Sequence, residues 1–397
     1  MMSPHAETAV VLSGGGARAA YQMGALRAVA RILGRNVPSP FGVITGTSAG
    51  AINAAALAAN ADNWRRGIAR TLRLWRNIAV GDVYEAELAS VAGYGMRWLA
   101  SVLVGGRGPG EATSMLDNAP LRGLLERALD MSAVPLRIQA GQLHALAINA
   151  TSYTTGHAVS FFDGVSSLAP WRRTRRRGER ALIAIDHLLA STAIPFIFPA
   201  VRVGMDYYAD GSMRQIAPLS PALHLGARRI LVVAVGQFAG QRPSTESPAQ
   251  PAPYPSFAQV AGHALTSIFL DNLGADLERM LRLNQVLNIV PPEVQAKHPE
   301  VAHVDALLLA PSRDLGQMAV AHAERLPTGV RYLLHGLGGT EGTGANLLSY
   351  LLFDRDYCRE LLALGYADAM MRRDEIAAFL SGDSAGFLPI MPAELLI

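Results

Sequence analysis

Short apolar runs alternate with segments of helical periodicity over the first sixty residues. The runs Thr8–Ser13 and Phe41–Thr45 are rich in β-branched residues, as is typical of strands buried on both faces. Arg18–Leu33 places Ala, Leu, Met and Arg at helical spacing, and an alanine-rich helix is expected from Ala49 to about Asn60. This β–α–β–α order predicts a parallel sheet covered by helices, because parallel strands need a helix-length crossover.

The same alternation continues through the rest of the chain. Further strands are expected at Leu143–Thr151, Ala158–Phe162, Arg229–Val235 and Val304–Leu309. Further helices are expected at Trp64–Ile78, Leu121–Leu129, Ile185–Thr192, Phe257–Leu283, Asn346–Leu364 and Asp368–Leu380. We therefore predict an α/β fold, a three-layer α/β/α arrangement with a mostly parallel central sheet, followed by a C-terminal helical region.

A proline-rich segment separates the predicted α/β part of the chain from the predicted helical part. Gln241–Pro255 holds most of the local prolines, which predicts a loop or linker. The expected organisation is one α/β domain over residues 7–237, a proline-rich linker or loop over 238–256 and a mainly helical C-terminal region over 257–397. A chain of 397 residues is long enough for one large domain or two smaller ones with a sizeable core.

Half of the residues are apolar and 17% are charged, with a formal net charge of +3. This balance excludes an intrinsically disordered chain, and a mildly basic charge does not by itself indicate a nucleic-acid partner. The single cysteine, Cys358, excludes a disulfide framework, and no histidine pair has metal-ligand spacing. No apolar run is long enough to span a membrane, and the N-terminus lacks the basic start of a signal peptide. We expect no cofactor or metal and a cytoplasmic protein that at most attaches to a membrane surface.

A glycine-flanked serine stands where the second predicted strand meets the alanine-rich helix. Gly46-Thr47-Ser48-Ala49-Gly50 fits G-x-S-x-G in the strand–turn–helix context that this motif requires. The sharp turn lifts the Ser48 hydroxyl out of the sheet, and the flanking Gly46 and Gly50 let chain and substrate approach closely. The following helix adds its positive N-terminal end. A purely structural turn is the alternative, and the context favours a nucleophile at Ser48.

A second glycine cluster follows the first predicted strand. Gly14, Gly15 and Gly16 can aim several backbone N–H groups at one point, which favours binding of a phosphate or of a developing oxyanion. The same stretch also fits the weak G-x-G-x-x-A form of a dinucleotide-binding motif. That motif requires an acidic residue about 20 positions on, and none occurs between Glu7 and Asp62. A nucleotide-binding oxidoreductase is therefore the weaker interpretation.

Four segments in order resemble the patatin-like phospholipase family. The family pattern is G-G-G-x-[RK]-G, then G-x-S-x-G, then D-G-[GA]. These appear here as Gly14–Ala19, Gly46–Gly50 and Asp210–Ser212, and Ala190–Val201 is a further similar segment between the last two. Ala19 and Ser212 stand where the family has glycine or a small residue. The resemblance covers roughly residues 8–236.

The resemblance implies a patatin-like catalytic domain and a serine acyl hydrolase that acts on phospholipids or lysophospholipids. It implies that Ser48 attacks the ester carbonyl, that Asp210 accepts its proton without a histidine, and that Gly14–Gly16 hold the oxyanion with Arg18 as an aid. An exposed aspartate is a poor base for a serine hydroxyl, so Asp210 should be partly desolvated. The apolar residues Tyr207–Ala209 that precede Asp210 agree with this.

Two alternatives stay open at this point. A Ser-His-Asp triad would place a histidine late in the chain, although no histidine lies in a distinctive motif. The histidines available for that role are His224, His263, His303, His322 and His335. A non-catalytic acyl-lipid-binding protein on the same fold is the second alternative, and the intact Ser48 and Asp210 argue against it.

Two further segments are candidates for membrane contact. Arg172–Arg180 holds the densest positive charge, and we expect a solvated loop there. Its functional alternative is a peripheral contact with an anionic membrane, at roughly 1 kcal/mol per arginine. Ser90–Gly110 mixes apolar and aromatic residues, which predicts a lid or interfacial helix, with a packed core helix as the alternative. The sequence leaves the oligomeric state open.

Overall fold

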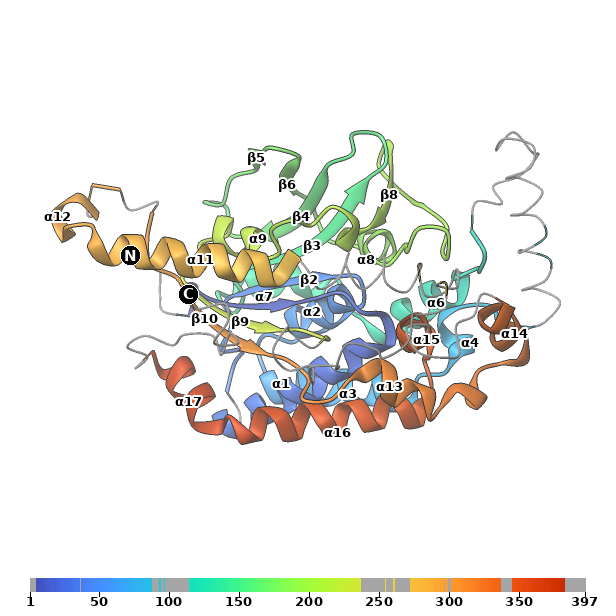
Figure 1. Cartoon of the computed structure of the whole chain (residues 1–397). Helices are drawn as coiled ribbons and strands as arrows, with labels where there is room; N and C mark the ends of the chain where they lie inside the picture. The colour runs from blue at the N-terminus through green and yellow to red at the C-terminus, as the bar shows by residue number, and fades with distance from the viewer. Residues whose placement is uncertain are drawn as a thin grey trace.

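The computed structural model describes residues 5–35, 37–87, 93, 96, 114–236, 254, 260, 272–295, 297–298, 301–336 and 345–382, with only the backbone of 333–336. Figure 1 shows a central sheet with helices on both of its faces. No helix in this described part of the chain is long and apolar enough to cross a membrane.

Ten strands of the described chain form one mixed sheet. Its order is β10-β9-β1-β2-β3-β4-β6-β5, with β8 beside the end of β3 and β7 beside β8. The strands are β1 Thr8–Leu12, β2 Val43–Thr47, β3 Ala145–Ser152, β4 Ala158–Gly164, β5 Trp171–Arg173, β6 Arg176–Arg180, β7 Val201–Val203, β8 Asp206–Asp210, β9 Arg229–Val233 and β10 Asp305–Leu309. The five strands from β10 to β3 are mutually parallel, whereas β4 and β8 pair antiparallel with β3. The expected mostly parallel sheet is confirmed, and it carries an antiparallel extension at one edge.

Helices cover both faces of this sheet. The helices are η1 Gly16–Ala19, α1 Ala20–Leu33, α2 Ala49–Ala59, α3 Trp64–Asn77, α4 Val80–Val83, α6 Ala119–Ala128, α7 Ala133–Gln139, α8 Ile185–Ser191, η2 Gly211–Met213, α9 Ser220–His224, α11 Asn272–Ile289, α12 Pro292–Gln295, α13 Leu315–Val320, η4 Ala323–Arg325, α14 Thr328–Gly336, α15 Ala345–Leu351, α16 Arg355–Met371 and α17 Arg373–Ser381. Val10 and Leu12 of β1 pack toward α1, α2 and α16, whereas Ala9 and Val11 pack toward α9 and α11. Because successive strand residues face opposite sides, this division confirms the three-layer arrangement.

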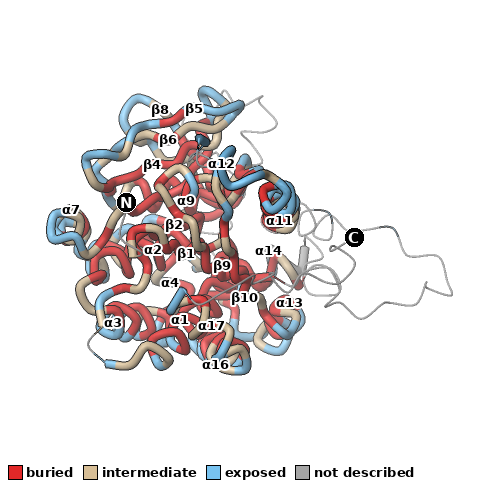
Figure 2. Tube along the Cα trace, turned by 90° about the vertical axis from the view of Figure 1, so that its left-hand side faces the viewer, coloured by how far each residue is buried: buried red, intermediate tan, exposed pale blue. Residues whose placement is uncertain are grey.

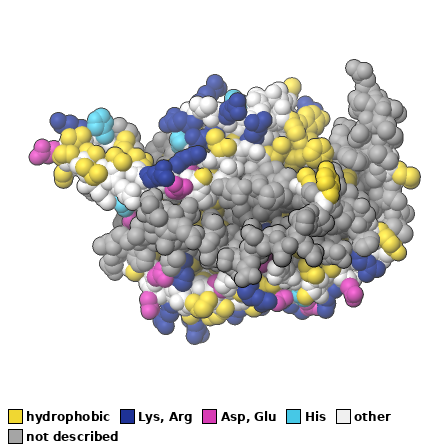
Figure 3. All heavy atoms as spheres, in the orientation of Figure 1, with side chains coloured by type: hydrophobic (Ala, Val, Ile, Leu, Met, Phe, Trp, Pro, Cys, Tyr) yellow, Lys and Arg dark blue, Asp and Glu magenta, His cyan; other side chains and the backbone are white. Residues whose placement is uncertain are grey.

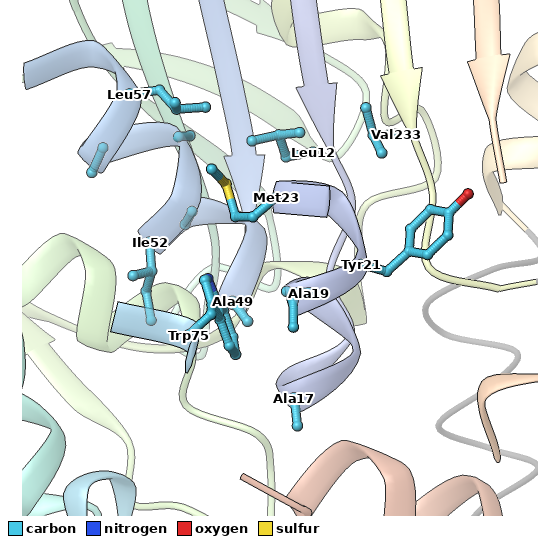
Figure 4. Packing of buried hydrophobic residues seen from close by; sticks show 14 of the residues in the cluster. Leu12, Ala17, Ala19, Tyr21, Met23, Ala49, Ile52, Leu57, Trp75 and Val233 are labelled. Carbon is cyan, nitrogen blue, oxygen red and sulfur yellow. The ribbon is translucent and has the colours of Figure 1, made fainter. Parts of the chain in front are cut away.

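Strands β1 and β2 are buried from end to end, and β9 is buried after its first residue, as the tube in Figure 2 shows. On the α1 side the core mixes small and large side chains. Figure 4 shows Ala49, Ile52 and Trp75 close together there, and the same three residues line one pocket. The many alanines of α2 bring that helix close to β2, which places the turn between them near the floor of the pocket.

The C-terminal helices pack directly on the first half of the chain. A Cβ added at Gly24 of α1 would lie 2.2 Å from the carbonyl oxygen of Leu362, and one at Gly365 of α16 would lie 2.1 Å from that of Tyr21. Glycine at both positions therefore allows α1 and α16 to approach closely. The C-terminal region is helical as expected, and it also adds strand β10 to the sheet. The expected domain boundaries stay a prediction, since the expected linker, apart from Tyr254, lies outside the described residues.

Two details differ from the sequence-based expectation. The basic run was expected as a solvated loop, and instead it forms the hairpin β5–β6, which extends the sheet beyond β4. The two strands pair through backbone groups, and Trp171 and Gly178 are the buried residues of this hairpin. The sequence therefore lacks the apolar alternation that would predict strands here. The helix expected at Asn346–Leu364 is two helices, because Asp354 caps the start of α16 and its carboxylate accepts from two backbone N–H groups there. Ser90–Gly110, apart from residues 93 and 96, lies outside the described residues.

Candidate active site

Ser48 lies in a strained turn between β2 and α2. Its backbone has φ 54° and ψ −131°, a region that residues with side chains rarely adopt. Such strain is characteristic of the turn that raises a nucleophile above the sheet. A Cβ at Gly46 would lie 2.4 Å from the Gly50 carbonyl oxygen, and one at Gly50 would lie 2.5 Å from that of Leu12. Both glycines of the motif are therefore required by close packing around Ser48.

Strand β3 explains how Asp210 reaches Ser48 from a distant part of the chain. Thr47 at the end of β2 pairs with Asn149, and Asp210 at the end of β8 pairs with the next residue, Ala150. Strand β2 runs parallel to β3 and β8 runs antiparallel to it. The two strands therefore approach each other end to end along one side of β3, and Ser48 and Asp210 lie where their ends meet.

Asp210 is held rigidly at this junction. Its N–H donates to the Ala193 carbonyl at 2.8 Å, and its carbonyl accepts from the Thr151 hydroxyl at 3.0 Å. Its carboxylate Oδ1 accepts from the Ser212 N–H at 2.9 Å. A Cβ at Gly211 would lie 2.2 Å from the Asn149 carbonyl oxygen, so the residue after Asp210 must be glycine.

The Asp210 carboxyl is 1% exposed, as the sequence-based argument for desolvation predicted. Burial raises the pKa of Asp210 from 3.8 to about 6, against the opposing effects of hydrogen bonding from Ser48 and Ser212. The second carboxylate oxygen, Oδ2, has no hydrogen bond of good geometry within the described part of the chain. Catalytic hydrogen bonds are often long in a free enzyme and tighten when substrate binds. Asp210 thus has a pKa near neutrality and an oxygen available to accept a proton.

Ser191 fixes the backbone of Ser48. The N–H of Ser48 donates to the Ser191 hydroxyl at 2.9 Å, and that hydroxyl donates to the Asn149 carbonyl at 2.6 Å. The N–H of Ser48 is therefore engaged within the protein. Sequence reasoning assigned no role to Ser191, although it lies in the Ala190–Val201 segment that carries part of the family resemblance.

The glycine loop supplies suitable donors. The N–H groups of Gly14, Gly15 and Gly16 donate to no acceptor in the part of the chain that the structure describes. Gly16 adopts φ +55°, and a Cβ there would lie 2.2 Å from the Tyr350 carbonyl oxygen. Gly16 also lines the same pocket as Ser48. Glycine is therefore required at Gly16 by both conformation and packing, at a position that lines the pocket of the candidate nucleophile.

Arg18 connects this loop to helix α15. Its Nε donates to the Ser349 hydroxyl at 2.7 Å, and its Nη2 donates to the Asn346 amide oxygen at 2.8 Å. The guanidinium also lies 4.5 Å from the centroid of the Tyr350 ring. These contacts give Arg18 a positioning role through the C-terminal region. Direct help from Arg18 to the oxyanion stays a prediction.

Ser48 lines an apolar pocket together with residues of α2, α3 and α6 and of the segment that follows α8. Trp75, Leu121, Leu125, Ile194, Phe198 and Phe353 are among the side chains that line it. The pocket is narrow, and its cavity volume of about 30 Å³ has room for about two water molecules. The lining is almost wholly apolar, and it includes Ser48.

The described histidines lie elsewhere. None of those with described side chains lines this pocket or affects the pKa of Asp210. His224 stacks on Trp171, His303 faces Asp305, and His322 contacts Glu360. The side chains of His263 and His335 lie outside the described residues. Among the described residues no cluster of potential ligands for a metal ion occurs.

Comparison with known proteins shows to which family this chain is similar. The sequence model of the patatin-like phospholipases matches residues 10–223. A cGAMP-activated phospholipase from Pseudomonas aeruginosa is 28% identical over 216 residues, which are 54% of this chain and 55% of that protein. This chain thus spans about half the length of that curated relative.

Two solved structures resemble the chain at low identity. VipD from Legionella pneumophila is 12% identical with a TM-score of 0.34, over 94% of this chain and 67% of that chain. Human GIVD cytosolic phospholipase A2, solved with methyl gamma-linolenyl fluorophosphonate, is 13% identical with a TM-score of 0.41, over 96% of this chain and 60% of that chain. The family model covers more than half of this chain, so the expected resemblance is confirmed, and the protein belongs to the patatin-like phospholipase family.

Proposed function

We propose that the protein is a serine lipid acyl hydrolase of the phospholipase A or lysophospholipase type. The observation that carries this proposal is the junction of β2 and β8, where a strained Ser48 that lines an apolar pocket adjoins a desolvated Asp210. Membership of the patatin-like phospholipase family supports the same activity and argues against a nucleotide-binding oxidoreductase. The two intact residues argue against a non-catalytic lipid binder.

In the first half of the reaction Ser48 is acylated. Its Oγ forms a bond to the ester carbonyl carbon while its proton passes to Asp210, whose raised pKa suits a base that works near neutral pH. The N–H groups of Gly14–Gly16 stabilise the oxyanion, because they are fixed donors in a site from which water is largely excluded. The bond to the leaving alcohol then breaks, and the alcohol takes the proton from Asp210.

In the second half a water molecule releases the acyl group. Asp210, again ionised, takes a proton from the water as its oxygen bonds to the acyl carbon. The Ser48 ester bond breaks, the fatty acid leaves, and the proton returns to the Ser48 oxygen. The same aspartate serves both halves, so this scheme needs no histidine.

The substrate we propose is a phospholipid or lysophospholipid, and the apolar pocket receives its acyl chain. We also propose a cytoplasmic enzyme that binds membranes peripherally, with the basic run Arg172–Arg180 contributing to that contact. The arginines at the β5–β6 turn are exposed, which supports such a contact.

Labelling with a fluorophosphonate tests the proposed activity, because the probe reacts with an activated serine. We expect one modified residue, Ser48, and loss of both labelling and ester hydrolysis in Ser48→Ala, which deletes a single oxygen. Ser381→Ala removes the same atom at an exposed position and serves as the control. Near-normal hydrolysis by folded Ser48→Ala would disprove the proposal.

A further inference from the structure

Three residues other than glycine have positive φ in the described chain: Ser48, Arg175 and Phe196. A left-handed conformation costs a residue with a side chain roughly 1–2 kcal/mol. At Ser48 the strain serves the nucleophile. Arg175 is exposed at the β5–β6 turn, and Phe196 is 69% exposed. Core packing cannot explain either side chain, so each strained position presents a charged or aromatic group to the surroundings of the protein.

Arg175 belongs to a row of three turns at one edge of the sheet. The Ala158 N–H donates to the Arg175 carbonyl, which joins the β5–β6 turn to the start of β4. The Tyr153 N–H donates to the Tyr207 carbonyl, which joins the β3–β4 turn to the β7–β8 hairpin. The three turns are therefore neighbours. We call this row, made of Arg172–Arg175, Tyr153–Gly156 and Gly204–Tyr207, the turn edge.

The turn edge lies beyond Ser48 on the same side of the molecule. Thr47 pairs with Asn149 on β3, and β3 continues from there toward Tyr153. At about 3.3 Å per strand residue, the turn at Tyr153 stands roughly 13 Å past the level of Thr47, the residue before Ser48. Phe196 lies between Ile194 and Phe198 in the sequence, and both of these residues line the apolar pocket, whereas Phe196 is exposed.

The turn edge exposes apolar side chains next to arginines. Met205 is 91% exposed, and Tyr153 and Tyr207 are each about half exposed. Figure 3 shows hydrophobic side chains gathered over β8, with Lys and Arg side chains over β5 and β6 beside them. Exposed aromatic and methionine side chains beside positive charge are the composition of surfaces that enter the boundary of an anionic bilayer.

The arginines of the basic run differ in how strongly they are held by contacts within the protein. Arg180 donates to the carbonyls of Gly164, Val165 and Leu168, and Arg177 pairs with Glu179 at 2.7 Å. Both are committed to the fold. Arg172, Arg173 and Arg175 are exposed, and Arg173 donates to the carbonyl of the neighbouring Arg172 at 2.9 Å. The one carboxylate of the turn edge, Asp206, already accepts from Ser152, Thr154 and the Tyr207 N–H. The turn edge is therefore positive toward its surroundings.

We propose that the turn edge, together with Phe196, is the surface by which the protein seats itself on an anionic lipid bilayer. Met205, Tyr153, Tyr207 and Phe196 enter the interface, and Arg172–Arg175 bind lipid phosphates. This orientation turns the carboxyl ends of the parallel strands, and so Ser48, toward the membrane. The inference rests on the proposed lipid hydrolase function. Of the basic run Arg172–Arg180, it assigns membrane contact only to the residues of the turn, Arg172–Arg175.

Binding to vesicles tests this surface separately from catalysis. The full chain and its variants are sedimented with phosphatidylcholine vesicles that contain or lack phosphatidylglycerol, and hydrolysis of a short soluble ester is measured in parallel. The test variants are Met205→Ser, Phe196→Ser and Arg175→Gly. The matched controls are Met371→Ser and Arg359→Gln, because both residues are exposed on α16, at the opposite end of the molecule in Figure 1.

We expect Arg175→Gly to bind anionic vesicles about fivefold more weakly, the ratio that corresponds to about 1 kcal/mol per charged contact. Met205→Ser and Phe196→Ser should also bind more weakly, because each removes apolar area from the interface. The controls should bind like the unchanged protein, and hydrolysis of the soluble ester should be unchanged in Met205→Ser, in Arg175→Gly and in both controls. Arg175→Gly should also melt no lower than the unchanged protein, because glycine relieves the positive φ. A merely structural role for Arg175 predicts equal vesicle binding by this variant.

Equal vesicle binding by the test variants and the unchanged protein would overturn the proposal, as would an equal loss in the α16 controls. Failure of the proposed function gives a different result. An unchanged protein that binds anionic vesicles but hydrolyses neither ester nor lipid would reject the enzyme activity and leave the docking surface supported.

Discussion

The parts of the described chain before residue 237 and after residue 271 share one core but contribute differently to the site. The first part carries Ser48, Asp210 and the glycine loop, which are the groups proposed to touch the reacting atoms. The second part adds β10 to the sheet, lays α16 along α1 and places Tyr350 against Gly16. We propose that the first region supplies the reacting groups, and the second region packs against the glycine loop and α1 and holds them in place. Substitutions in the two should therefore affect different quantities: turnover in the first region and stability in the second.

Gly16→Ala tests the first region and has the largest expected effect. A methyl group there meets the Tyr350 carbonyl and strains a backbone at φ +55°, so the loop must shift. Loss of one oxyanion donor costs about 2.7–4 kcal/mol, a fall of about 10²–10³-fold in kcat. Steady-state kinetics at matched folded concentration measures this. Gly81→Ala is the control, since its Cβ meets nothing within 4 Å. A rise in KM with unchanged kcat would indicate a binding loop instead.

The pH profile tests the base in the same region. Asp210 accepts a proton only when ionised, and its pKa of about 6 predicts that kcat/KM falls about tenfold per pH unit below pH 6. Above that value the rate should be level. An ordinary aspartate with a pKa near 3.8 would keep its activity down to about pH 4. Full activity at pH 4.5, with the protein folded, is the result that contradicts the assignment.

The raised pKa of Asp210 also affects folding. The folded state binds this proton more tightly than the unfolded chain does, so the stability it contributes is fully present below pH 3.8 and is lost as pH rises through about 6. The difference between the pKa values of the unfolded and folded chain corresponds to about 3 kcal/mol of unfolding free energy that is lost by neutral pH. Asp210→Asn should therefore unfold at a higher urea concentration than the unchanged protein at pH 8.

Gly365→Ala tests the second region. Its Cβ would lie 2.1 Å from the Tyr21 carbonyl oxygen, so α16 must move away from α1. Overpacking of this kind costs about 1–3 kcal/mol, and we expect a lower melting temperature with kcat per folded molecule nearly unchanged. Calorimetry and kinetics on one preparation separate the two effects. A large fall in kcat without a loss of stability would break the distinction between the regions.

Ser349→Ala tests how far the second region supports the glycine loop, and its expected effects on stability and turnover are the smallest. Ser349 accepts from Arg18 at 2.7 Å and so connects the second region to the glycine loop. A hydrogen bond to a charged group contributes about 1.5–3 kcal/mol. We expect a modest loss of stability and a kcat reduced several-fold at constant KM, because the loop loses a support. Unchanged kinetics would show that Arg18 needs no anchor on α15.

Local sequence patterns predicted the parts of the site that depend on local conformation. Ser48 and the glycine loop follow buried strands directly, and their turns are set by the glycines themselves. The desolvation of Asp210 followed from its apolar neighbours. The meeting of Asp210 with Ser48 depends instead on the register of two strands against β3, and no local pattern encodes a register between distant segments.

Three other features escaped the sequence for similar physical reasons. Strands β5 and β6 pair through backbone groups while most of their arginines stay in solvent, so no apolar alternation marks them. The Ser191 hydroxyl acts through a single hydrogen bond to the Ser48 backbone. The contact of α15 with Gly16 joins residues more than three hundred positions apart. Each depends on tertiary packing alone.

The central claim is that Ser48 and Asp210 form a dyad that works without histidine. Its most direct test compares Ser48→Ala, Asp210→Asn and ten single His→Ala variants on one soluble ester. An amide keeps the shape of Asp210 and still accepts from Ser212, but it cannot take the serine proton. We predict that Asp210→Asn is nearly as inactive as Ser48→Ala and that no histidine variant approaches that loss. A folded but inactive histidine variant, or an active Asp210→Asn, would contradict the dyad.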